Sequence, residues 1–250
     1  MTEASNGPRG GSEVGYFLIR RLHSLTGIIP IGVFLCFHLT INATVVLGPD
    51  KFQAGVDRIH AMDELGVLKI VEVVGIFIPL AIHAVLGLQI WLTGRQNVLA
   101  YRYGANIRYT LQRWTALITL AFILFHVWQM HWLGGWFPPG GEQFVPGQAP
   151  KSAAEAIQAS TWYAPIYVIG VLAAVFHFAN GIWTFLISWG VTITRRTQGR
   201  VGYVCAAVGI VFAAVGLSSL VVLKTTDPAT LHVEPHEASH AVAVNLDPAD

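Results

Sequence analysis

Four histidines are spaced along this chain so that each falls in the middle of a different long apolar stretch. They are His38, His83, His126 and His177. A histidine at mid-membrane depth is costly unless it faces other protein groups and finds a partner. Four such residues could serve as hydrogen-bonding links between helices, as a proton relay, as a zinc site or as axial ligands of haem.

The residues around the histidines favour haem among these four roles. A proton relay would need interleaved carboxylates, yet Glu72 is the one acid within an apolar stretch. A zinc site requires ligands that converge on one tetrahedral point. A haem requires only two imidazoles on opposite sides of a flat ring. We therefore expect two haems b, each held by two of the histidines.

The composition indicates an all-α integral membrane protein. Of the 250 residues, 54% are hydrophobic and 12% are charged, whereas about 25% charged residues is usual in soluble domains. The net charge of +1 offers no site for nucleic acid. About 20 apolar residues cross a bilayer, and five segments qualify: 24–47, 70–92, 114–136, 163–190 and 201–223. We expect a flexible cytoplasmic N-terminus over 1–15, a membrane domain over 16–223 and a polar outer tail over 224–250.

The basic residues predict the direction of the spans. Ten arginines gather at one end of the spans: Arg9, Arg20, Arg21, Arg95, Arg102, Arg108, Arg113, Arg195, Arg196 and Arg200. The opposite end has only Lys51, Arg58, Lys69, Lys151 and Lys224. Because basic residues collect on the cytoplasmic side, the N-terminus is expected in the cytoplasm and the C-terminus outside.

Short connections predict an up-down-up-down bundle for the first four spans, with the fifth at its periphery. Neighbouring helices lie about 8 to 10 Å apart, so diagonal helices lie roughly 14 Å apart. Two imidazoles around an iron fit the diagonal, which pairs His38 with His126 and His83 with His177. Gly87 and Gly181 each follow a ligand by one turn, where a missing side chain would admit the porphyrin edge.

Four segments resemble the dihaem cytochrome b subunit of succinate:quinone oxidoreductase, in its five-helix, single-polypeptide form. They are YFLIRRLHSLTGIIP at 16–30, QRWT at 112–115, FHVW at 125–128 and FHFANG at 176–181. The resemblance implies the same four axial ligands in the same pairs. It places the His83 and His177 haem proximal to an iron-sulfur subunit and the His38 and His126 haem distal.

The resemblance also implies partners and a substrate. Flavoprotein and iron-sulfur subunits would dock on the cytoplasmic face of a bacterial-type membrane, and electrons would pass through the haems to a quinone, with menaquinone expected. Fumarate reductases of this type that move protons across the membrane carry a glutamate two residues before the fourth-span ligand. Val175 stands there in this chain, which favours succinate oxidation. A cytochrome b anchor of another dehydrogenase, the fumarate-reducing direction and a haem-free transporter or anchor remain alternatives.

Several other polar residues have alternative roles. Glu72 is a hypothetical proton donor or acceptor for the quinone, or a residue that reaches to water. Arg21, His23 and Ser24 offer contacts for haem propionates, or ordinary anchoring at the membrane surface. His232, His236 and His240 recur every four residues, but Pro235 interrupts any helix that would align them as metal ligands.

Overall fold

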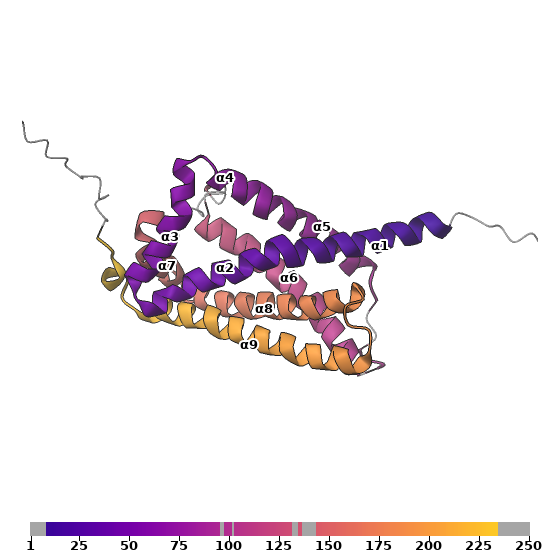
Figure 1. Cartoon of the computed structure of the whole chain (residues 1–250). Helices are drawn as coiled ribbons and strands as arrows, with labels where there is room; N and C mark the ends of the chain where they lie inside the picture. Colours follow the sequence, from indigo (N-terminus) through magenta and orange to yellow (C-terminus); the bar gives the residue numbers. More distant parts are fainter. Residues whose placement is uncertain (1–8, 96–97, 102, 132–134, 137–143, 235–250) are drawn as a thin grey trace, which may run out of the picture.

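The computed structural model describes residues 9–95, 98–101, 103–131, 135–136 and 144–234, and these residues form helices and turns with no strand among them. Five segments are long and apolar enough to span a membrane, which confirms the all-α membrane architecture. They are Val14–Leu47, Leu68–Thr93, Gly104–Met130, Tyr163–Ser188 and Arg195–Thr225. The chain enters at one end of the bundle and leaves at the other (Figure 1), as five crossings require.

The first two spans are assembled from consecutive helical pieces. The first consists of α1 (Arg9–Thr26), the π-helix η1 (Gly27–Ile31), α2 (Gly32–Ala43) and the 3₁₀ turn η2 (Thr44–Leu47). The second consists of α4 (Leu68–Ile70), the π-helix η3 (Val71–Phe77) and α5 (Ile78–Thr93). The other three are the single helices α6 (Gly104–Met130), α8 (Tyr163–Ser188) and α9 (Arg195–Thr225).

Helix boundaries differ from the expected ones where polar residues extend a span. α1 begins at Arg9, within the segment 1–15 that was expected to be flexible, and α6 begins at Gly104 rather than near Trp114. Those added turns carry arginines and amides that composition alone assigns to a loop. α6 also ends at Met130, because His131 adopts an extended backbone conformation.

Each of the five spans packs against at least two others. α1 packs along α5, α6 packs along α8, α5 touches α6, and η1 touches α8. α9 packs against α8 and α2. Large apolar side chains such as Val33, Leu124 and Ile210 point away from these contacts and are more than 60% exposed. In a bilayer such faces contact lipid, so apolar exposure on the spans carries no cost.

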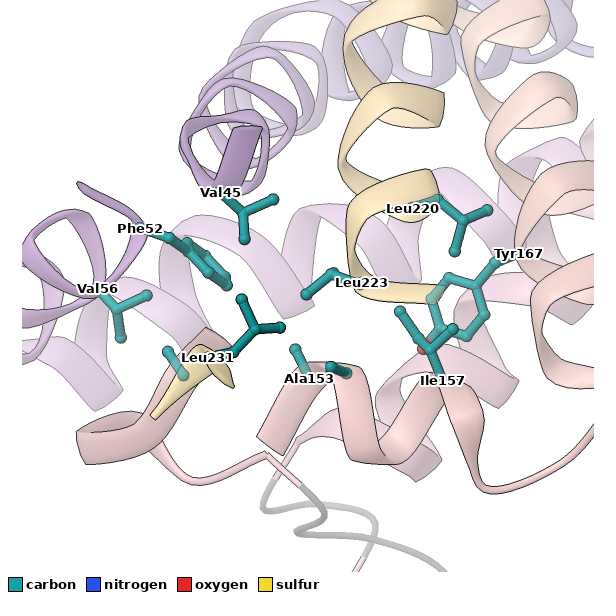
Figure 2. Packing of buried hydrophobic residues seen from close by; sticks show 11 residues of the cluster. Val45, Phe52, Val56, Ala153, Ile157, Tyr167, Leu220, Leu223 and Leu231 are labelled. Carbon is teal, nitrogen blue, oxygen red and sulfur yellow. The ribbon is translucent and has the colours of Figure 1, made fainter. Parts of the chain in front are cut away.

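Two helices between the spans form a cap over the end of the bundle where the chain terminates. α3 (Pro49–Glu64) and α7 (Ala149–Gln158) lie there with the 3₁₀ turn η6 (Pro228–Leu231). Figure 2 shows Phe52, Ile157 and Leu231 meeting the last turns of α9 in one buried apolar cluster. We call this the cap end, and the opposite end, where Arg95 and Arg195 lie, the arginine end.

Hydrogen bonds from two glutamine side chains hold the segments of the cap together. Gln53 donates to the Pro146 carbonyl at 2.7 Å and accepts from the Ala149 backbone N–H at 2.9 Å. Gln148 exchanges two hydrogen bonds with the backbone of Val233, at 2.7 and 3.2 Å. These bonds tie residues 228–234 to the bundle, so the described part of the C-terminal tail is packed against the membrane domain.

A buried arginine on α6 caps the C-terminal end of α5. Arg113 on α6 is 8% exposed. Its guanidinium donates to the carbonyls of Trp91, Ile90 and Gly94 at the end of α5, where the last carbonyls of a helix need partners from outside it. The Ile90 carbonyl also accepts from the Gly94 backbone N–H. The sequence suggested that Arg113 anchors the helix at the membrane surface. The structure shows instead that it caps a neighbouring helix, as cations do at helix C-termini.

Candidate functional site

The four intramembrane histidines form two facing pairs at different depths. The ring centroids of His38 and His126 lie 5.7 Å apart, with the ring planes at 78°. Those of His83 and His177 lie 6.2 Å apart, with the planes at 83°. We call these the cap-side pair and the arginine-side pair. Each pair joins one of the first two spans to the span two positions later, α2 to α6 and α5 to α8.

Hydrogen bonds at Nδ1 orient both rings of the arginine-side pair. Nδ1 of His83 lies 2.9 Å from the His23 carbonyl, and Nδ1 of His177 lies 3.2 Å from the Gln112 carbonyl. A carbonyl oxygen can only accept, so each Nδ1 carries the proton. Nε2 of each ring is then the nitrogen with a free lone pair, which is the usual arrangement around a metal-binding histidine.

The cap-side pair is oriented by a tyrosine. Nδ1 of His126 lies 3.1 Å from the Tyr167 hydroxyl, which donates to Oε1 of Gln129 at 2.9 Å. Gln129 is fully buried and donates its amide to the Ala156 carbonyl at 2.9 Å. Since the Tyr167 proton is used toward Gln129, its oxygen accepts from His126. The Nδ1–H form of His126 follows, again leaving Nε2 free.

His38 is held more loosely than the other three. Its Nε2 lies 3.5 Å from the Asn42 amide, at the limit of a hydrogen bond. The same amide donates to the backbone carbonyl of His38 at 2.8 Å, which is the stronger interaction. The ring otherwise contacts Phe34, at 5.4 Å between centroids. A ligand bond from Nε2 requires only that the Asn42 amide give up this long contact, because the amide can keep its bond to the His38 carbonyl.

A fifth histidine completes the arginine-side group. His23 stacks on His83 with centroids 4.0 Å apart, and its Nδ1 lies 3.0 Å from the His83 carbonyl. The two residues therefore exchange ring-to-carbonyl bonds across α1 and α5. Each ring rests on a glycine of the other helix: a Cβ on Gly27 would lie 2.4 Å from His83, and one on Gly87 would lie 2.8 Å from His23.

This packing changes the interpretation of the glycines. Gly87 was expected to admit a porphyrin edge, but the side-chain atoms nearest to it belong to His23. At Gly181 a Cβ would make ordinary van der Waals contact with the side chains of Gln112 and Ile28, at 3.8 and 4.0 Å. The sequence missed the role of Gly27, although its spacing from His23 equals that of Gly87 from His83.

The three residues considered for propionates point in two directions. The guanidinium of Arg21 lies over the Trp189 ring at 4.6 Å, and the Trp189 indole donates to Ser24 at 3.1 Å. Arg21 and Trp189 also line an open apolar groove of about 400 Å³. His23 turns to the other side of α1, toward His83. Arg21 and Ser24 thus share one face, and His23 belongs to the histidine group.

Glu72 lies beside His131, a histidine that is not one of the four candidate ligands. Its carboxylate is 3.7 Å from Nε2 of His131, just past the end of α6. Burial lowers the pKa of His131, while the carboxylate of Glu72 acts in the opposite direction. In an unbroken α-helix Glu72 would share the face of His83 to within about 20°. The π-helix η3 adds a residue to the turn and rotates Glu72 by roughly 100°, toward α6.

Of the three tail histidines, the structure describes only His232. His232 is exposed, and His236 and His240 lie outside the described residues. Within the described ranges, no group of three or more His, Cys, Asp or Glu side chains could hold a metal ion. A haem needs only two protein ligands, so this result leaves the facing pairs as candidates.

A known protein is similar in sequence to most of this chain. The chain is 35% identical over 208 residues to the succinate dehydrogenase cytochrome b558 subunit of Bacillus subtilis (strain 168), a match that covers 82% of this chain and 95% of the relative. No family model matches the sequence. The chain belongs to the family of succinate dehydrogenase cytochrome b subunits, the membrane anchors of that enzyme.

Proposed function

We propose that this anchor holds two haems b, one between His38 and His126 and the other between His83 and His177. The observation that carries the proposal is the spacing of the rings. Two imidazoles bound to opposite sides of one metal, at about 2 Å per bond, have centroids roughly 6 Å apart. The observed separations are 5.7 and 6.2 Å. Three of the four rings also have Nδ1 engaged, which leaves Nε2 for iron.

When bound, the haems supply one-electron carriers at two depths of the membrane. The protein residues bind and orient them: the histidines supply Nε2, and Tyr167, Gln112 and the His23 carbonyl fix the ring directions. The apolar helices exclude water around both pairs.

The proposed route runs from the cytoplasmic face to a quinone. The flavoprotein and iron-sulfur subunits of succinate dehydrogenase dock at the arginine end, so the arginine-side pair is proximal and the cap-side pair distal. Oxidation of succinate to fumarate releases two electrons and two protons, and reduction of a quinone, here menaquinone, consumes the same number. This assignment puts the arginine end in the cytoplasm of a bacterial-type membrane, with the C-terminus outside.

The direction of the reaction is proposed from Val175. This residue is 3% exposed and lies against the position of Gly209 on α9. Because residue 175 is valine, the chain has no acid at the position where proton-moving fumarate reductases have one. The position is buried between α8 and α9. Succinate oxidation is the direction that fits.

The haem content of the purified complex tests the proposal. We expect about two haems per chain by pyridine haemochrome assay, and a b-type α-band in the dithionite-reduced minus oxidised spectrum. The absence of that band would contradict haem binding and indicate that the histidines form polar contacts between helices. One haem per chain would show that only one facing pair binds iron.

Glu72 is proposed as the residue that exchanges protons with the quinone near the distal pair. It lies at the cap end, partly exposed, with His131 as a neighbour that can share a proton. Glu72→Gln should lower succinate-driven quinone reduction by about 10²-fold or more and leave the haem spectrum unchanged. Glu155→Gln, at an exposed site on α7, is the control. Unchanged turnover in Glu72→Gln would remove this residue from the mechanism.

A further inference from the structure

A chain of polar side chains joins α6 to α8 beside the arginine-side pair. Nε of Arg108 donates to Oδ1 of Asn180 at 2.9 Å, and Nδ2 of Asn180 donates to Oε1 of Gln112 at 2.8 Å. Nε2 of Gln112 then donates to the backbone carbonyl of His177 at 3.1 Å. The backbone carbonyl of Gln112 accepts from the His177 ring. Arg108 is thereby connected to a proposed haem ligand through two amides.

The direction of these bonds is fixed at both ends. A guanidinium has only donors, and a backbone carbonyl has only acceptor sites. Asn180 must therefore turn its oxygen toward Arg108, and Gln112 must turn its nitrogen toward His177. Both amide dipoles then point their positive ends toward His177. Hydrogen bonds aligned in series polarise one another in a medium of low dielectric constant.

Arg108 lies in a setting that preserves its electrostatic effect. Its guanidinium packs over the ring of Trp183 at 3.8 Å, and Asn180 is 4% exposed. Among the residues that the structure describes, the two ion pairs involve other side chains, so no carboxylate neutralises Arg108. Charges interact more strongly at such sites than in water. A cation there favours the state of a nearby iron that holds one more electron.

We propose that Arg108, acting through Asn180 and Gln112, raises the reduction potential of the haem held by His83 and His177. The inference rests on the proposed haem ligation. Arg108 is a positioning and tuning residue and not a ligand. A higher potential at the proximal haem favours electron entry from the iron-sulfur subunit.

Redox titration of the purified complex, followed by haem absorbance, tests the assignment. Arg108→Gln should move the midpoint of one haem component to lower potential and leave the other in place. The shift should persist in a His126→Ala background and disappear in a His83→Ala background. Arg108→Lys, which retains the charge, should shift the midpoint less. Arg200→Gln removes an exposed arginine from the same end and should shift neither component.

A second variant keeps the proposal testable if Arg108→Gln does not assemble. Asn180→Asp places a carboxylate against the guanidinium without changing side-chain size, and should lower the same midpoint. If an assembled variant shows two unchanged midpoints, or equal shifts of both, the inference is wrong. Wild-type protein with fewer than two haems would instead contradict the ligation on which the inference rests.

Discussion

Replacing His38 or His126 with alanine is expected to remove the same haem from the complex. Each variant should retain about half of the wild-type haem, because a single axial imidazole leaves one side of the iron without its strong protein ligand. The reduced minus oxidised spectra of these two variants should superimpose. His83→Ala and His177→Ala should form a second matching set with a different α-band.

This comparison of the four variants does not require either haem to be assigned beforehand, because variants that lose the same haem have the same spectrum. His60→Ala, on α3 outside the spans, serves as the control and should retain both haems. Matching spectra for His38→Ala and His83→Ala would overturn the pairing. His38→Ala could retain more residual haem than His126→Ala, because His38 is the more loosely held ring.

Gly27→Ala is expected to abolish haem binding by the arginine-side pair although no ligand is changed. The added methyl group would lie 2.4 Å from Cε1 and 2.8 Å from Nδ1 of His83. The imidazole has no easy movement away, because its other contacts are the stacked ring of His23 and the bond from Nδ1 to the His23 carbonyl. Overpacking of this kind costs about 1 to 3 kcal/mol, and here the strain falls on the orientation of the ligand.

The spectrum of Gly27→Ala should therefore match that of His83→Ala, with the other haem intact. Gly15→Ala is the control on the same helix, since a Cβ at Gly15 meets nothing within 4 Å. Full haem content in Gly27→Ala would mean that the His83 ring moves when haem binds.

The spans and the facing histidines could be predicted because both depend on strong, local signals. Uninterrupted apolar runs identify the spans, and one histidine in each of four runs identifies the candidate ligands. Partners at Nδ1 could not be predicted, since two of them are backbone carbonyls, which every residue carries. The stacking of His23 on His83 was also missed, because it depends on the register of α1 against α5.

The cap and the contact between Glu72 and His131 could not be predicted from the sequence, for other reasons. α3 is short and rich in polar residues, and only its contacts with α7 and Leu231 bury Phe52 and Val56. The contact of Glu72 with His131 could not be predicted, because an ideal α-helix gives the wrong direction for this side chain when a π-helix intervenes. Arg108 and Arg113 were used only to predict the direction of the spans, and the sequence did not reveal that both side chains turn toward neighbouring helices.

The role of Tyr167 bears on the order in which the protein matures in the membrane. Tyr167 orients His126 and belongs to the buried cluster that Leu220, Leu223 and Leu231 complete. Leu220 and Leu223 lie on α9 and Leu231 lies in η6, so all three come from segments that follow the fourth span. The contacts described for the arginine-side pair come from α1, η1, α5, α6 and α8, all of which belong to the first four spans. The surroundings of the cap-side pair are therefore complete only after the fifth span and η6 have packed, whereas those of the arginine-side pair do not require either segment.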